Sequence, residues 1–97
     1  MRIYIAGPMT GLPDLNRKAF ADACYDLGAK GIEAVNPHIL HPPVVEWPQA
    51  MRTDLVCMLN CDAVALLDGW RQSRGALLEH YVATSVGIHC APLETYL

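Results

Sequence analysis

Apolar residues alternate along the chain between short continuous runs and runs spaced three or four residues apart, which predicts strands separated by helices. The continuous runs lie at 2–6, 32–35, 63–67 and 88–91. Helical spacing covers about 14–29, 49–59 and 74–86, with a glycine after the first and the last of these segments. The run 63–67 is apolar throughout, so we expect this strand at the centre of a sheet.

Strands and helices follow one another through mostly short connections, and right-handed crossovers then favour a parallel sheet. We therefore expect one α/β domain over residues 1–97, a Rossmann-like fold with a short parallel sheet and helices on both faces. Ligands of such sheets bind beyond the carboxyl ends of the strands. Segments 7–10, 36–37 and 68–73 follow those ends here.

The stretch 36–48 holds four prolines and several large apolar residues, which predicts an ordered but irregular loop. Those apolar side chains need cover, and 53% hydrophobic residues is a high content for a small monomer. We therefore expect contacts between subunits, with the loop as a candidate interface.

Charge and cysteine content narrow the choice of partners. A net charge of −3 argues against duplex nucleic acid, since binding to phosphate backbones needs an excess of lysine and arginine. The first apolar run is too short for a signal peptide or a membrane span, so we expect a cytoplasmic protein. Cys57 and Cys61 are four residues apart, and His38 and His41 lack further ligands nearby, so we expect reduced thiols, no metal and no cofactor.

A glycine turn, Gly7-Pro8-Met9-Thr10-Gly11, follows the first strand. Because glycine has no Cβ, the backbone of such a turn can approach a ligand closely. An ordinary tight turn is the alternative.

The segment Asp68-Gly69-Trp70 follows the central strand directly. A carboxylate at the end of a strand can accept ribose hydroxyls, and an indole can stack on a base. In the alternative interpretation, Asp68 caps a loop amide and Trp70 packs under the proline-rich loop.

The last helix carries Glu79 on the same face as Gly75, among small and apolar neighbours. A carboxylate in that environment requires a polar partner, and Gly75 leaves room for a ligand to supply it. Otherwise Glu79 lies at a solvated edge and pairs with Arg74 or His80.

Ser73 is a candidate N-cap for that helix. Together with the free amides of the first turn, and with Arg71 and Arg74 nearby, it could hold a phosphate.

These segments occur in a recognisable order. They are Tyr4-Ile5-Ala6-Gly7-Pro8-Met9, Asn36-Pro37, Asn60-Cys61-Asp62-Ala63-Val64, Leu67-Asp68-Gly69-Trp70 and Ser73-x-Gly75-Ala76-x-x-x-Glu79. Over nearly its whole length, the chain resembles the nucleoside 2-deoxyribosyltransferase superfamily. Its shortness and its Asp-Gly-Trp and Ser-x-Gly-Ala elements resemble the compact phage and prophage branch, the anti-Thoeris sponge proteins.

The resemblance implies a homo-oligomer, with a tetramer as the expected form, in the cytoplasm of a bacterial host cell. It implies a protein that sequesters an immune signal of the cyclic ADP-ribose or cyclic-nucleotide type without cleaving it. In transferase relatives a glutamate attacks the anomeric carbon of the sugar, a role that maps onto Glu79, with Asp68 orienting the sugar or assisting at the base. An N-glycosidase or deoxyribosyltransferase with these two catalytic residues is therefore the alternative. A third possibility is an interaction protein that kept the fold and lost the pocket.

For a binding protein, we expect segments 7–9 and 73–75 to contact phosphates, Trp70 to stack, and Asp68 and Glu79 to bind ribose hydroxyls. All of these segments must then face one cleft. The complete set of expected ligand-binding residues is Tyr4, Ala6, Gly7, Pro8, Met9, Asn36, Asp68, Gly69, Trp70, Ser73, Arg74, Gly75 and Glu79.

Overall fold

A computed structural model describes residues 1–42 and 44–97, and it confirms the predicted α/β fold with an all-parallel sheet. In this part of the chain the strands are β1 (Arg2–Ala6), β2 (Glu33–Val35), β3 (Ala63–Leu66) and β4 (His89–Pro92). The α-helices are α1 (Arg17–Ala29), α2 (Trp47–Leu59) and α3 (Arg74–Ser85). Short 3₁₀ turns lie at Pro13–Asn16, Pro37–Ile39, Trp70–Gln72 and Leu93–Tyr96.

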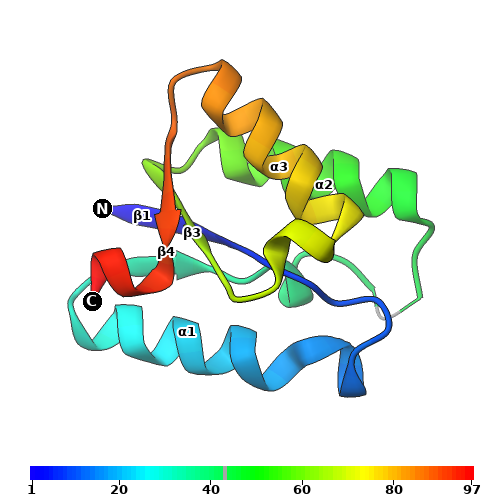
Figure 1. The fold of residues 1–97 in the computed structure, drawn as a ribbon, viewed down its shortest axis with the longest axis horizontal. Helices are drawn as coiled ribbons and strands as arrows, with labels where there is room; N and C mark the ends of the chain where they lie inside the picture. The colour runs from blue at the N-terminus through cyan, green and yellow to red at the C-terminus, as the bar shows by residue number, and fades with distance from the viewer. Residues whose placement is uncertain (43) are drawn as a thin grey trace.

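The helices cover both faces of the sheet, as predicted. Helix α1 lies on one face and α2 and α3 lie on the other (Figure 1). Successive side chains of β1 alternate between the two layers. Ile3 and Ile5 pack in the core with Phe20 of α1, whereas Tyr4 and Ala6 pack in the core with α2 and α3.

The strand order β2-β1-β3-β4 places the topological switch point between β1 and β3. Strand β2 pairs with one edge of β1. The chain then crosses back over β1, and β3 pairs with its other edge. The loop after β1 and the N-terminal ends of α2 and α3 gather at the same end of the molecule (Figure 1). The fold therefore brings three chain segments to the point where open parallel sheets bind ligands.

Two helices begin at residues other than the predicted ones. Helix α1 begins at Arg17, because residues 14–16 adopt the left-handed conformation with φ of 49°, 53° and 61°. Helix α2 begins at Trp47, two residues early, with Pro48 in its first turn, where a missing amide hydrogen has no cost. The predicted loop is shorter as a result, and Pro43 within it lies outside the described residues.

The C-terminal turn, Leu93–Tyr96, was not predicted. Leu93 and Tyr96 pack against the core on the α1 side, and the Tyr96 hydroxyl donates a hydrogen bond to the Val64 carbonyl oxygen at 3.1 Å. This turn therefore closes the sheet face opposite α2 and α3.

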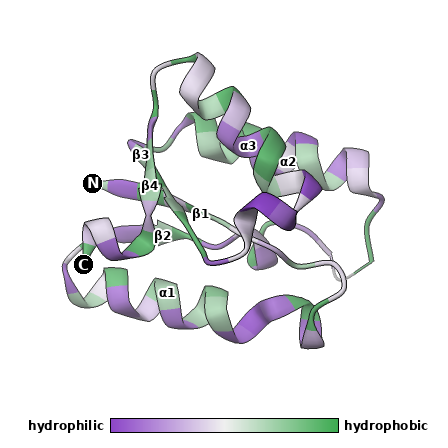
Figure 2. Ribbon diagram, in the orientation of Figure 1, coloured by the Kyte–Doolittle hydropathy of each residue, from purple (hydrophilic) through white to green (hydrophobic). Residues whose placement is uncertain are grey.

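Hydropathy follows the layers of the fold. Figure 2 shows the central strands mainly in the colours of hydrophobic residues and the helices in mixed bands, as expected for helices with one buried face. Within residues 1–42 and 44–97, no helix combines the length and the apolar character needed to span a membrane.

Candidate functional site

A cavity of about 570 Å³ lies at the switch point of the sheet. Its walls come from the turn after β1 (residues 7–10), from the first two turns of α2, and from the start of α3 with the preceding turn. Pro37 and His41 complete the wall on the side of the proline-rich loop. The glycine turn and the start of the last helix therefore face one cleft, as predicted from the sequence.

Glu79 lines this cavity and is 5% exposed. The hydroxyl of the fully buried Tyr4 donates a hydrogen bond to Glu79 Oε2. Strand β1 and helix α3 are thus linked by a polar contact inside an otherwise apolar layer. The predicted alternative, in which Glu79 pairs at a solvated edge with Arg74 or His80, is wrong because the carboxyl group is buried.

Burial raises the pKa of Glu79 to about 8, since the charged form loses its hydration. The Tyr4 hydrogen bond opposes this shift, and the nearby Asp54 carboxylate adds to it. The pKa of Tyr4 is also raised, first by burial and then by Glu79. At neutral pH the Glu79 carboxyl group is therefore mostly protonated in the free protein and can both donate and accept hydrogen bonds.

Asp54 of α2 is a second buried carboxyl group in the same cavity, 6% exposed. Its Oδ1 atom has no hydrogen-bond partner among the described residues. His41 Nε2 lies 3.4 Å from that oxygen without meeting the geometry of a hydrogen bond. Burial raises the pKa of Asp54 to about 6, while His41 lowers it. A buried oxygen that accepts no hydrogen bond and borders a cavity is a ready acceptor for a ligand hydroxyl or amine.

Both carboxylates occupy the middle of a buried helical stripe. On α2 the buried residues are Met51, Asp54 and Met58, and on α3 they are Ala76, Glu79 and Ala83. Both sets have a spacing of three and then four residues, which places all three side chains on one helix face. Each helix therefore directs one carboxylate toward the sheet between apolar neighbours.

Arg74 and Trp47 lie where α3 and α2 begin, and both line the cavity. The Arg74 guanidinium lies over the Trp47 ring, 3.7 Å from its centroid. Ser73 caps α3, because its Oγ accepts a hydrogen bond from the Ala76 amide at 3.1 Å. The predicted N-cap is confirmed, and the hydroxyl is already occupied by that role.

Two glycines of the site have packing roles that the sequence did not indicate. A Cβ at Gly7 would lie 2.8 Å from Leu67 Cβ, so this glycine permits close packing of the segments that follow β1 and β3. A Cβ at Gly75 would lie 3.2 Å from Met51 Sδ. The expected room for a ligand at Gly75 is therefore partly filled by Met51 of α2, although Gly75 still borders the cavity.

Four predicted residues lie apart from the cavity. Asp68 and Gly69 are exposed and line smaller hollows elsewhere at the sheet end. The Trp70 ring packs on His80 with the centroids 4.5 Å apart, and Arg71 lies over its ring. The Asn36 side chain accepts a hydrogen bond from the His38 amide at 3.0 Å. The turn 70–72 that carries Trp70 borders the cavity through Gln72, as predicted, but it directs the Trp70 ring toward α3 and away from the cavity wall.

The other predicted residues lie in or directly behind the wall. Pro8, Met9, Ser73 and Arg74 line the cavity together with Gly7, Gly75 and Glu79. Tyr4 lies behind Glu79 as its hydrogen-bond donor, and Ala6 is buried in the same apolar layer. Their contacts with a ligand stay predictions.

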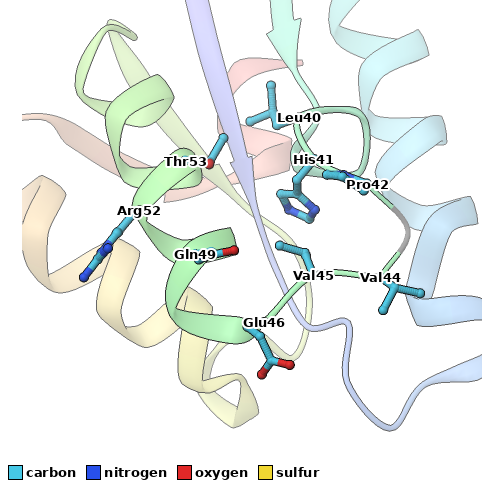
Figure 3. A pocket seen from close by; sticks show the side chains of 9 residues that line it. All are labelled: Leu40, His41, Pro42, Val44, Val45, Glu46, Gln49, Arg52 and Thr53. Carbon is cyan, nitrogen blue, oxygen red and sulfur yellow. The ribbon is translucent and has the colours of Figure 1, made fainter.

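A second hollow of about 610 Å³ lies between the proline-rich loop and α2. Figure 3 shows His41 and Val45 of the loop facing Gln49 and Thr53 of α2, while Arg52 points away. His41 also lines the first cavity, so the two spaces share this residue. The loop therefore forms one wall of the buried site.

Sequence reasoning missed Asp54, His41 and Trp47. For Asp54 a signal was present, because it lies three residues after Met51 and four before Met58 on the apolar stripe of α2. A carboxylate on such a stripe is the same anomaly that identified Glu79. Nothing in the sequence around His41 or Trp47 separates them from other loop residues.

Over residues 1–91, the sequence matches the family described as Domain of unknown function (DUF4406). A search among curated proteins gave no match.

Proposed function

The chain belongs to the family described as Domain of unknown function (DUF4406), and on that premise we propose that it binds a nucleotide-derived small molecule without cleaving it. The site is the cavity at the switch point. The observation that carries the proposal is the pair of buried carboxyl groups, Asp54 and Glu79, facing that one cavity.

The carboxyl groups suit the sugar of a nucleotide. Asp54 Oδ1 is buried, lies 3.4 Å from His41 Nε2 and accepts no hydrogen bond in the described part of the chain, so a ribose hydroxyl could supply the missing donor. Glu79, protonated at neutral pH and held by Tyr4, can bind a second hydroxyl. Asp54 thus takes the sugar-binding role that the sequence assigned to Asp68.

The start of α3 suits the phosphate. The first amides of a helix have no partner within the helix, and the helix dipole favours an anion there. Arg74 adds a positive charge at the same edge of the cavity. A nucleotide could therefore place its sugar on the buried carboxyl groups and its phosphate at the helix start.

The ionisation state of Glu79 favours binding over cleavage. Attack on an anomeric carbon needs a carboxylate anion, whereas a pKa of about 8 keeps most of this group protonated near neutrality. We extend the proposal to the role that the resemblance implies: sequestration of an immune signal of the cyclic ADP-ribose or cyclic-nucleotide type by an oligomer.

One observation favours the alternative, an N-glycosidase or deoxyribosyltransferase. Enzymes that cleave glycosidic bonds commonly use two carboxyl groups in one site, one as the nucleophile and the other as the general acid or base. Glu79 would be the nucleophile, and Asp54 would replace Asp68 as its partner because Asp68 lies outside the cavity.

Calorimetry with AMP, ADP-ribose and cyclic ADP-ribose, followed by denaturation and chromatography, tests the proposal. We expect binding and recovery of intact ligand, with Asp54→Asn weakening the affinity and the matched control Asp68→Asn leaving it unchanged. Glu79→Gln should retain binding, because an amide still forms hydrogen bonds. Free base in the chromatogram, lost in Glu79→Gln, would establish the enzyme instead, and no heat with any nucleotide would refute both functions.

A further inference from the structure

Trp47 and Arg74 form a stacked pair at the edge of the cavity. The Arg74 guanidinium lies 3.7 Å from the centroid of the indole ring, a distance typical of a close cation–π contact. Trp47 belongs to the first turn of α2 and Arg74 to the first turn of α3, so the pair joins the two helix starts across the site. Neither residue belongs to the apolar core that holds the helices on the sheet.

Trp47 is half-buried and contributes to the cavity wall. Its indole Nε1 lies close to the space above Gly75, 3.9 Å from where a Cβ at that position would be. The ring therefore lies next to the start of α3. Arg74 covers one face of this large flat ring, and a purine or pyrimidine could stack on the opposite face.

Arg74 provides the charge that such a ligand requires. In the part of the chain that the structure describes, it forms no ion pair with a carboxylate. Arg74 is exposed and is the first residue of α3, the end of the helix at which a phosphate would be favoured. Base and phosphate would thus meet neighbouring groups, Trp47 and Arg74.

The other tryptophan lacks these properties. Trp70 packs on His80 and belongs to the apolar layer under α3, outside the cavity wall. Its position makes it a matched control, since both tryptophans lie near the start of α3 and only one of them borders the cavity.

We infer that Trp47, with Arg74 stacked on it, is the residue that selects ligands with a flat nitrogenous base. The inference rests on the proposed function and makes it more specific. The ligand class becomes a base-bearing nucleotide, distinguished from sugar phosphates that would satisfy Asp54, Glu79 and Arg74 alone.

The test compares AMP with ribose 5-phosphate by calorimetry in wild type, Trp47→Ala and Trp70→Ala. Trp47→Ala should bind AMP at least about tenfold more weakly, because one stacked base is lost. It should bind ribose 5-phosphate within about twofold of wild type. Trp70→Ala should bind both probes like wild type. An equal loss for both probes would mean that Trp47 only positions Arg74, and unchanged AMP affinity in Trp47→Ala would also overturn the inference.

A second measurement leaves Trp47 in place, so it does not depend on the folding of the alanine variant. In Trp70→Phe, Trp47 is the only tryptophan of the chain, and stacking on AMP should quench its fluorescence while ribose 5-phosphate should not. Binding of AMP by calorimetry without quenching would overturn the stacking role and leave the proposed function intact. Failure of wild type to bind AMP would overturn the inference, and failure to bind any of AMP, ADP-ribose and cyclic ADP-ribose would refute the proposed function itself.

Discussion

Glu79 and Asp54 show how single residues define this site. Each sits in the middle of a buried helical stripe, where burial raises its pKa and favours the neutral form. Glu79 is predictable from the sequence because its neighbours on the helix face are small or apolar. Asp54 also lies among apolar residues on one face of α2. Charged residues are common on helices, however, and Asp54 is buried only because this face of α2 packs on the sheet. Only the packing of α2 reveals that.

The Glu79 pKa makes the stability of the protein depend on pH. The folded pKa of about 8 lies above the ordinary value of 4.5, so folding favours the protonated form. The contribution of protonated Glu79 to the free energy of unfolding is fully present below pH 4.5 and is lost as the pH rises through the folded pKa of about 8. Between pH 6.5 and 8.5, the free energy of unfolding should fall by about 2 kcal/mol in wild type.

Glu79→Gln should remove most of that slope, because the amide does not titrate. Urea unfolding of both proteins at pH 6.5 and 8.5 measures the difference. Asp54 titrates largely below this range, so it contributes little to the comparison. Equal slopes in wild type and variant would show that Glu79 is ionised in the folded protein at neutral pH.

At the scale of elements, the positions of strands and helices follow from the sequence, and the directions of some loop side chains do not. The two central strands, β3 and β1 beyond its first residue, are apolar runs buried on both faces, as a covered parallel sheet requires, whereas the edge strands β2 and β4 include the exposed residues Glu33 and His89. Trp70 follows the central strand, as a ligand-contacting residue would, yet the turn 70–72 rotates its ring toward His80. Trp47 lies in what the prolines predicted to be loop, and it becomes a site residue only because α2 begins there.

The contact between the ends of β1 and β3 depends on Gly7. A methyl group at this position would overlap Leu67 Cβ, and the neighbouring strands leave little room to adjust. Gly7→Ala should therefore lower the free energy of unfolding by about 1–3 kcal/mol. Gly28→Ala in α1 is the matched control, since a Cβ there meets nothing within 4 Å.

Because alanine favours helix, the control should raise stability by about 0.5–1 kcal/mol. Urea unfolding midpoints of the two variants provide the comparison. A Gly7→Ala protein as stable as wild type would contradict the close approach of Gly7 to Leu67 at the ends of β1 and β3.

At the scale of the whole molecule, the topology creates the site. Strand β2 is added on one side of β1 and strand β3 on the other. At this switch point the glycine turn, the start of α2 and the start of α3 meet at one end of the sheet. Residues far apart in sequence, such as Thr10, Asp54 and Glu79, thereby surround a single space. One of the smaller hollows, by contrast, lies beside α1, and four acidic residues line it: Asp22, Asp26, Asp68 and Glu94.

Amide chemical-shift mapping of the ¹⁵N-labelled chain, titrated with ADP-ribose, tests the location of the site most directly. We predict the largest shifts at the amides of Thr10, Asp54 and Gly75, with those of Asp22 and Asp26 unchanged. The largest shifts around Asp22 and Asp26, or none at saturating ligand, would contradict a nucleotide site at the junction of β1, β3, α2 and α3.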